Sequence, residues 1–135
     1  MSRKIFVNLP VKDLKRSMAF FEQLGFTFNP QFTDDSAACM VITDYIHSML
    51  LTHAKFKMFT TKDIVDTTKS TEVLTALSCE SRAEVDDLLA KALKAGAIES
   101  GPLQDYDFMY GRSFDDLDGH TWEIFWMDRN HIQKT

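Results

Sequence analysis

The chain has 135 residues, of which 44% are hydrophobic and 26% charged, and its formal net charge is −5 at pH 7. These values are typical of one folded globular domain and argue against disordered and fibrous proteins. An acidic chain without a basic stripe does not present the electrostatic surface that nucleic acid requires, so we expect no nucleic-acid partner.

The N-terminal stretch MSRKIFVNLPV contains basic residues but no long apolar run, and no segment reaches the length needed to cross a bilayer. We therefore expect a cytoplasmic protein with no membrane partner. Cys39 and Cys79 stand far apart without a CxxC motif. This spacing favours reduced core cysteines over a disulfide scaffold or a structural zinc site.

The first half of the chain predicts one helix and four strands. Residues 5–11 have the pattern of a strand, and Asp13 is the expected N-cap of a helix that ends at Gly25. Short strands are then predicted, with acidic turn residues between them, at residues 26–32, 37–43 and 47–53.

The second half repeats this order after a polar segment, residues 55–70. A strand over 71–79 precedes a helix that begins at Ser81, with Glu84 completing a capping box, and ends at Gly96. Further strands are predicted at residues 97–99, 108–114 and 120–127. The helix starts Asp13 and Ser81 lie 68 residues apart.

This weak repeat predicts a single domain, 1–135, built from two modules. Module 1 covers about 1–54, a linker about 55–70 and module 2 about 71–130. The linker contains Phe56, Met58 and Phe59. These side chains either close over a cavity as a lid or pack beneath the linker as a small additional core.

The last predicted strand carries a charge in an apolar setting. Because successive side chains point to opposite faces, Glu123 shares a face with Phe125 and Met127, while Trp122 and Ile124 lie on the other face. A buried carboxylate costs several kcal/mol unless it is paired, protonated or bound to a metal. Glu123 is therefore the leading candidate for a functional residue.

The partner of Glu123 depends on the turn that precedes its strand. A two-residue loop at Asp118 and Gly119 would place Arg112 on the face of Glu123, whereas a turn with a glycine bulge would place Ser113 opposite it. The D-x-D-G sequence favours the bulged form. Arg112 is thus a doubtful partner for Glu123.

Three stretches resemble one protein family: FVNLPVKDLKRSMAFFEQLGF, LSCESRAEVDDLLAKALKAGA and MYGRSFDDLDGHTWEIFWMD. They combine V-x-D-L-x-x-S-x-x-F-[FY]-x-x-L-G-F near the start with D-x-D-G-[NH]-x-x-E near the end. In this order, around a repeated β-α-β-β-β pattern, they resemble the glyoxalase/bleomycin resistance/dioxygenase superfamily, also called vicinal oxygen chelate proteins. The resemblance covers nearly the whole chain.

The resemblance implies an α+β fold in which two βαβββ modules form a curved, half-open mixed sheet. It also implies a cavity with a divalent metal, held by His or Glu on the first strand of each module and by Glu on the last strand. Glu123 matches the last of these positions. A homodimer is implied in the same way.

The other ligand positions carry residues that do not bind metals. They are occupied by Phe6, Leu74 and, near the end of module 1, Leu50. Asn8 and His53 are the nearest substitutes, although His53 is out of phase with Leu50 unless the strand is bulged. Glu123 and His53 are the candidate ligands for zinc, nickel, manganese or iron, and a metal-free site is equally compatible.

Three functions follow from these residues. A lyase or isomerase similar to lactoylglutathione lyase would use Glu123 as metal ligand and base, and a metal-free enzyme would use Glu123 alone. A non-catalytic protein would instead bind a small drug or metabolite in the cavity. In each case the expected lining consists of Phe6, Asn8, Leu50, His53, Leu74 and Phe125 around Glu123.

Overall fold

The computed structural model describes residues 2–131, which form two compact units. Unit 1 ends at Asp66 and unit 2 begins at Thr67, so the division falls inside the segment expected to link the modules. Residue 1 and residues 132–135, the ends of the expected 1–135 domain, lie outside the described part. Within residues 2–131, no helix combines the length and the apolar character needed to span a membrane.

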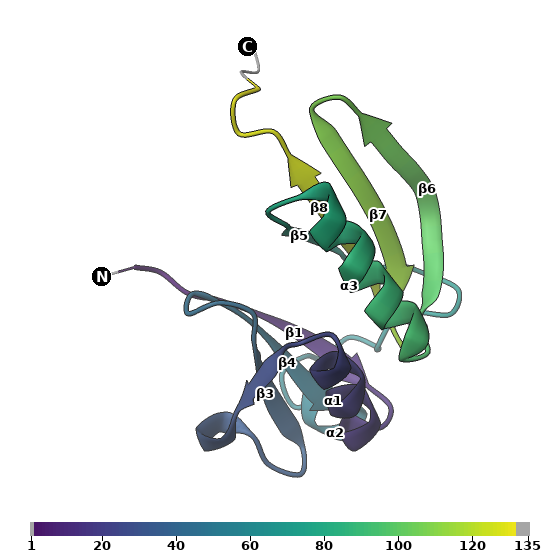
Figure 1. The fold of residues 1–135 in the computed structure, drawn as a ribbon. Helices are drawn as coiled ribbons and strands as arrows, with labels where there is room; N and C mark the ends of the chain where they lie inside the picture. The colour runs from purple at the N-terminus through teal and green to yellow at the C-terminus, as the bar shows by residue number, and fades with distance from the viewer. Residues whose placement is uncertain (1, 132–135) are drawn as a thin grey trace. The chain divides into compact units, whose positions relative to one another are not determined.

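Unit 1 contains a four-stranded mixed sheet with one long helix on one face (Figure 1). Its strands lie in the order β1-β4-β3-β2, with β1 and β4 parallel and the other pairs antiparallel. The elements of unit 1 are β1 (Ile5–Val11), α1 (Leu14–Gln23), β2 (Thr27–Asn29), the 3-10 helix η1 (Pro30–Phe32), β3 (Ala37–Val41), β4 (Ile46–Thr52) and α2 (His53–Phe56).

Unit 2 repeats this topology, with α3 lying across its sheet (Figure 1). The strand order is β5-β8-β7-β6, and β5 pairs with β8 in parallel. Its elements are β5 (Leu74–Ser78), α3 (Arg82–Lys94), β6 (Ile98–Tyr106), β7 (Met109–Asp115) and β8 (Thr121–Met127). The predicted α+β class with two βαβββ modules is therefore confirmed, and each module forms its own four-stranded sheet.

Several predicted strand boundaries were wrong, three of them for a clear local reason. The strand expected over 26–32 ends at Asn29, which accepts a hydrogen bond from the Gln31 amide and starts η1. The strand expected over 47–53 ends at Thr52, which caps α2. The strand expected over 97–99 continues to Tyr106, because a bulge with Gly101 at φ +67° carries β6 past Pro102.

Each core forms between the long helix and one face of the sheet. In unit 1, Phe20 and Phe21 of α1 and Leu50 of β4 are at most 2% exposed. In unit 2, Val85 and Leu89 of α3 are at most 1% exposed, as are Trp122 and Ile124 of β8. The predicted caps Asp13 and Ser81 accept hydrogen bonds from the backbone at the helix starts.

The turn between β7 and β8 is organised by Asp116, whose side chain is buried. One carboxylate oxygen accepts the backbone N–H groups of Asp118 and His120 at 2.9 and 3.0 Å, and the other accepts the indole Nε1–H of Trp122 at 2.9 Å. Gly119, at φ +85°, closes the turn. Burial raises the pKa of Asp116, and the nearby His120 opposes this rise.

This turn sets the pairing of β7 with β8. Ser113 lies opposite Glu123, and Arg112 lies opposite Ile124. The bulged turn that the D-x-D-G sequence favoured is therefore confirmed. Arg112 consequently lies on the opposite face of the sheet from Glu123.

Removing the Asp116 carboxylate should destabilise unit 2. We expect Asp116→Ala to lower the free energy of unfolding by about 3 kcal/mol, because the buried Trp122 Nε1–H and two backbone donors lose their acceptor. Urea unfolding followed by tryptophan fluorescence measures this, since both tryptophans, Trp122 and Trp126, lie in unit 2. Asp107→Ala, at an exposed site on the β6–β7 turn, is the control; an equal loss in both variants would contradict the role of Asp116.

Candidate functional site

Glu123 lies in the middle of the sheet face that α3 leaves uncovered. Its neighbours across the sheet are Ala76 of β5 and Ser113 of β7. Along β8, Phe125 and Met127 follow on the same face, as the alternation predicted. Strand pairing therefore places a small residue on each side of the carboxylate and apolar side chains beyond it.

A cavity of about 280 Å³ lies against this face. Its lining is mostly apolar, and the polar residues in it are Gln104, Arg112, Ser113 and Glu123. The lining residues are Ala76, Pro102, Gln104, Met109, Gly111, Arg112, Ser113, Glu123, Ile124, Phe125 and Met127. A concave apolar site with few polar groups is the usual form of a small-molecule pocket.

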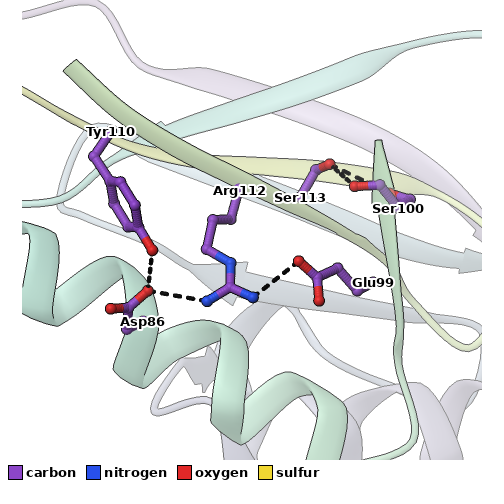
Figure 2. A network of polar contacts seen from close by, with 6 residues as sticks. All are labelled: Asp86, Glu99, Ser100, Tyr110, Arg112 and Ser113. Atoms are coloured by element: carbon purple, nitrogen blue, oxygen red, sulfur yellow. Dashed lines mark hydrogen bonds and ion pairs between the residues drawn. The ribbon is translucent and has the colours of Figure 1, made fainter. Parts of the chain in front are cut away.

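Glu123 is partly buried and makes no hydrogen bond or ion pair within the described part of unit 2. Its opposite neighbour Ser113 is occupied elsewhere: the Ser113 hydroxyl donates to the carbonyl oxygen of Ser100 and accepts from the Ser100 hydroxyl (Figure 2). The carboxylate therefore remains available at the cavity surface, which is unusual for a charge among apolar side chains.

The nearest strand cation, Arg112, is held on the opposite face by a polar network (Figure 2). Its guanidinium donates to Asp86 of α3 at 3.1 Å and to Glu99 of β6 at 2.9 Å. Tyr110 also donates to Asp86, at 2.5 Å. The hydrogen bond from Tyr110, together with the Arg112 charge, holds the pKa of Asp86 below its usual range. Hydrogen bonds to the same carboxylates raise the pKa of Arg112, and both of its ion pairs are made away from Glu123.

Unit 1 carries a different pair of residues at the place of Ala76 and Glu123. Asn8 stands five residues before the cap Asp13, as Ala76 stands five before Ser81. Across the parallel strand pair, Asn8 lies opposite Met49. Met49 is therefore the module 1 counterpart of Glu123.

Leu50 was predicted to line the cavity, and this assignment needs correction. Leu50 points to the helix-covered face, where it is 0% exposed and part of the core. The strand register places Met49 and Leu51 on the uncovered face instead, because alternate residues share a face. The prediction was one residue out of phase.

The structure places the other predicted lining residues in two groups. In unit 2, Leu74 and Phe125 share the face of Glu123, and Phe125 lines its cavity. In unit 1, Phe6 shares the face of Asn8 and stacks on His47 with ring centroids 4.5 Å apart. His53 is the exposed first residue of α2. The ligand-binding roles of these residues stay predictions.

Sequence reasoning missed the cavity residues that β6 contributes. Pro102 and Gln104 belong to the part of β6 beyond the Gly101 bulge, which the alternation pattern did not reveal. Met109 and Gly111 were accessible to reasoning, because the bulged turn that places Ser113 opposite Glu123 also places them on the same face. The D-x-D-G turn sequence, rather than a chemical motif, would have identified these two residues as part of the cavity lining.

Comparisons with known proteins agree with this fold. Residues 3–43 match the family model described as "Bleomycin resistance protein-like N-terminal". A glyoxylase/bleomycin resistance protein/dioxygenase domain from Frankia sp. EAN1pec is 25% identical, with a TM-score of 0.71, and the match covers 97% of this chain and 96% of that one. These matches support the resemblance to the glyoxalase/bleomycin resistance/dioxygenase superfamily that the sequence motifs indicate.

Further solved structures share the superfamily fold. A hypothetical protein, SA1046 from S. aureus, is 29% identical over 93% of this chain and 95% of that one, with a TM-score of 0.77. A family enzyme from Burkholderia phytofirmans PsJN, at 16% identity, covers 93% and 99% with a TM-score of 0.76 and supports the fold alone. No curated protein gives a match to the chain.

The metal-ligand set that the superfamily resemblance implies does not fit the residues of this chain. The corresponding positions carry Phe6, Met49 and Leu74, which have no oxygen or nitrogen donor in their side chains, so Glu123 is the single carboxylate among them. A catalytic metal site usually needs at least three protein ligands. Within the described residues of each unit, no three His, Cys, Asp or Glu side chains gather to hold a metal. The pairing of Glu123 with His53 joins two units and stays a prediction.

The Asp86 network should give unit 2 a pH-dependent stability. Because the folded-state pKa of Asp86 is lowered, its contribution is present above the unfolded pKa of about 3.9 and is lost as the pH falls through the folded value. We expect Asp86→Asn to cost up to about 1 kcal/mol at pH 7, a value limited by the 52% exposure of this side chain, and less at lower pH.

Urea unfolding of both proteins between pH 7 and pH 3 measures this difference. Asp87→Asn is the matched control, because Asp87 makes an exposed ion pair with Lys91 one helical turn away. A difference between wild type and Asp86→Asn that grows as the pH falls would contradict the assignment.

Proposed function

We propose that the cavity of unit 2 binds a small, largely apolar molecule through a positively charged group, which pairs with Glu123. The observation that carries this proposal is that Glu123, on a face with a cavity, has no hydrogen-bond or ion-pair partner among the described residues of its unit. A carboxylate in apolar surroundings is stabilised most by a cation or a strong hydrogen-bond donor. A ligand with such a group would supply the partner that Glu123 lacks among the described residues of unit 2.

The apolar part of the ligand would contact Phe125, Met109 and Met127. Phe125 offers a flat aromatic surface, and methionine side chains adapt to irregular ligand shapes because they are unbranched and flexible. Met127 is 48% exposed, so binding would remove apolar surface from water. The family model, named after bleomycin resistance, is consistent with binding of a compound without chemical change.

We also propose a homodimer, on the superfamily resemblance alone. The molar mass of the protein in solution, measured by light scattering during size-exclusion chromatography, tests this point separately. The mass of one chain is 15.5 kDa.

Charge neutralisation at Glu123 should weaken the binding of an aromatic cation. We expect Glu123→Gln to raise the Kd of N-methylquinolinium about tenfold, because the ion pair is lost while the shape of the side chain is kept. Quenching of the probe fluorescence or isothermal titration calorimetry measures this Kd.

The control for this experiment is Glu72→Gln, which changes the net charge by the same amount at an exposed position of unit 2. Equal effects of the two variants would mean that only the overall charge of −5 attracts the probe. That outcome would overturn the proposed role of Glu123.

A second candidate function is a metal-free lyase or isomerase in which Glu123 removes a proton next to a carbonyl. The specific observation in its favour is Gln104, which lines the same cavity. Its amide N–H is a neutral donor of the kind that stabilises a developing oxyanion. Glu123, without a competing partner in its unit, would act as the base.

Metal content and turnover separate these functions. Because the ligand positions carry apolar side chains, we expect purified protein to hold far less than stoichiometric zinc, nickel, manganese or iron by mass spectrometry. The hemithioacetal of methylglyoxal and glutathione is the substrate for the activity assay, with and without EDTA. Under the binding proposal, wild type and Glu123→Gln show the same background rate.

Two outcomes would contradict the binding proposal. Turnover that survives EDTA and disappears in Glu123→Gln would establish the metal-free enzyme. Stoichiometric metal that is lost in Glu123→Gln would show that a residue such as His53 completes a metal site, and proton transfer assisted by that metal would then be the function to test.

A further inference from the structure

Unit 1 has a cavity of its own, on the uncovered face of its sheet. Its volume is about 450 Å³, and it is lined by Asn8, Leu51, Phe56, Phe59 and Thr60. Asn8 and Leu51 project from the parallel strands β1 and β4, while the other three belong to the chain that follows β4. The sheet thus forms one side of the cavity and the segment after β4 forms the other.

The segment that carries the aromatic side chains is held in a defined turn. Thr52 accepts a hydrogen bond from the Lys55 amide at 3.2 Å and begins α2. The Phe59 amide then donates to the Phe56 carbonyl oxygen at 3.0 Å, which keeps the two phenylalanines one turn apart. Lys57 Nζ donates to the Lys62 carbonyl oxygen at 2.9 Å, which connects the two ends of residues 57–62.

Large apolar side chains remain in water at this cavity. Phe59 is 71% exposed and its neighbour Met58 is 72% exposed. The Lys55 ammonium lies 5.7 Å from the centroid of the Phe59 ring, a cation–π contact that restrains the ring. Covering these side chains would remove apolar surface from water, so a ligand gains free energy by contacting them.

The polar groups of this cavity are neutral. Asn8 Nδ2 lies 3.4 Å from the Phe6 carbonyl oxygen, which leaves the amide oxygen of Asn8 to accept a hydrogen bond from a ligand. The Thr60 Oγ accepts from the Lys62 amide at 3.1 Å and keeps its own proton for donation. No acidic or basic residue belongs to the described lining. Desolvation therefore disfavours a charged ligand here.

We propose that unit 1 binds an uncharged aromatic compound, whose ring contacts Phe56 and Phe59 and whose N–H or O–H group donates to Asn8. This site is formed by other residues than the Glu123 cavity, and it favours an uncharged ligand because no charged residue belongs to its described lining. The proposal does not depend on the function assigned to unit 2. It gives the aromatic segment after β4 a role as the wall of a binding site.

Binding of N-phenyl-1-naphthylamine to the intact chain tests the proposal. This probe is aromatic, uncharged at neutral pH and carries one N–H donor, and its fluorescence rises in apolar surroundings. We expect saturable binding by wild type, with Kd raised roughly five- to tenfold in Phe59→Ala and in Asn8→Leu. Phe59 is exposed, so its replacement leaves the core intact.

Two control variants decide where the probe binds. Phe32→Ala removes another exposed phenylalanine of unit 1, 60% exposed, that does not line the cavity, and it should leave the Kd unchanged. Glu123→Gln should also leave it unchanged, which separates this site from the proposed function of unit 2. The amide spectrum of each variant, recorded by NMR, verifies its fold.

Three outcomes would overturn the proposal. The first is the absence of saturable binding by wild type. The second is an equal effect of Phe59→Ala and Phe32→Ala, which would show nonspecific adsorption to exposed rings. The third is a loss of binding in Glu123→Gln equal to that in Phe59→Ala, which would place the probe in the cavity of unit 2.

Discussion

The pairing register between β7 and β8 determines what the cavity of unit 2 contains, and the buried carboxylate of Asp116 fixes that register. By accepting two backbone N–H groups and the Trp122 indole, Asp116 holds the bulged turn that places Ser113 opposite Glu123. A slip of one residue would turn every side chain of β8 to the other face. Trp122 and Ile124 would then enter the cavity, and Glu123 would be driven beneath α3.

The two faces of the β5–β8 sheet deal with charge in different ways. Beneath α3, the guanidinium of Arg112 makes ion pairs with the carboxylates of Asp86 and Glu99 through its two terminal nitrogens. On the other face, Glu123 lies among apolar side chains and has no hydrogen-bond or ion-pair partner within residues 67–131. This separation leaves one negative charge at the cavity, which is the physical basis for proposing a cationic ligand.

The two modules share one topology but differ in the residues at their equivalent positions. Unit 1 has Asn8 opposite Met49 where unit 2 has Ala76 opposite Glu123. Unit 1 has the apolar side chain of Met49 in place of the carboxylate and the neutral amide of Asn8 in place of Ala76, so the two uncovered faces stabilise different ligands. The repeat therefore gives one scaffold with two chemically distinct surfaces, and function is a property of these few side chains rather than of the fold.

The sequence by itself determined the α+β class, the two βαβββ modules, the helix caps and the face of Glu123, because these depend on local periodicity and turn chemistry. The D-x-D-G turn even indicated that Ser113, and not Arg112, lies opposite the carboxylate. Tertiary structure decided what local pattern does not encode: that Leu50 belongs to the core, that β6 continues past its bulge to bring Gln104 to the cavity, and that Arg112 is bound by residues from α3 and β6. Each of these depends on contacts between residues distant in sequence, which strand alternation alone cannot specify.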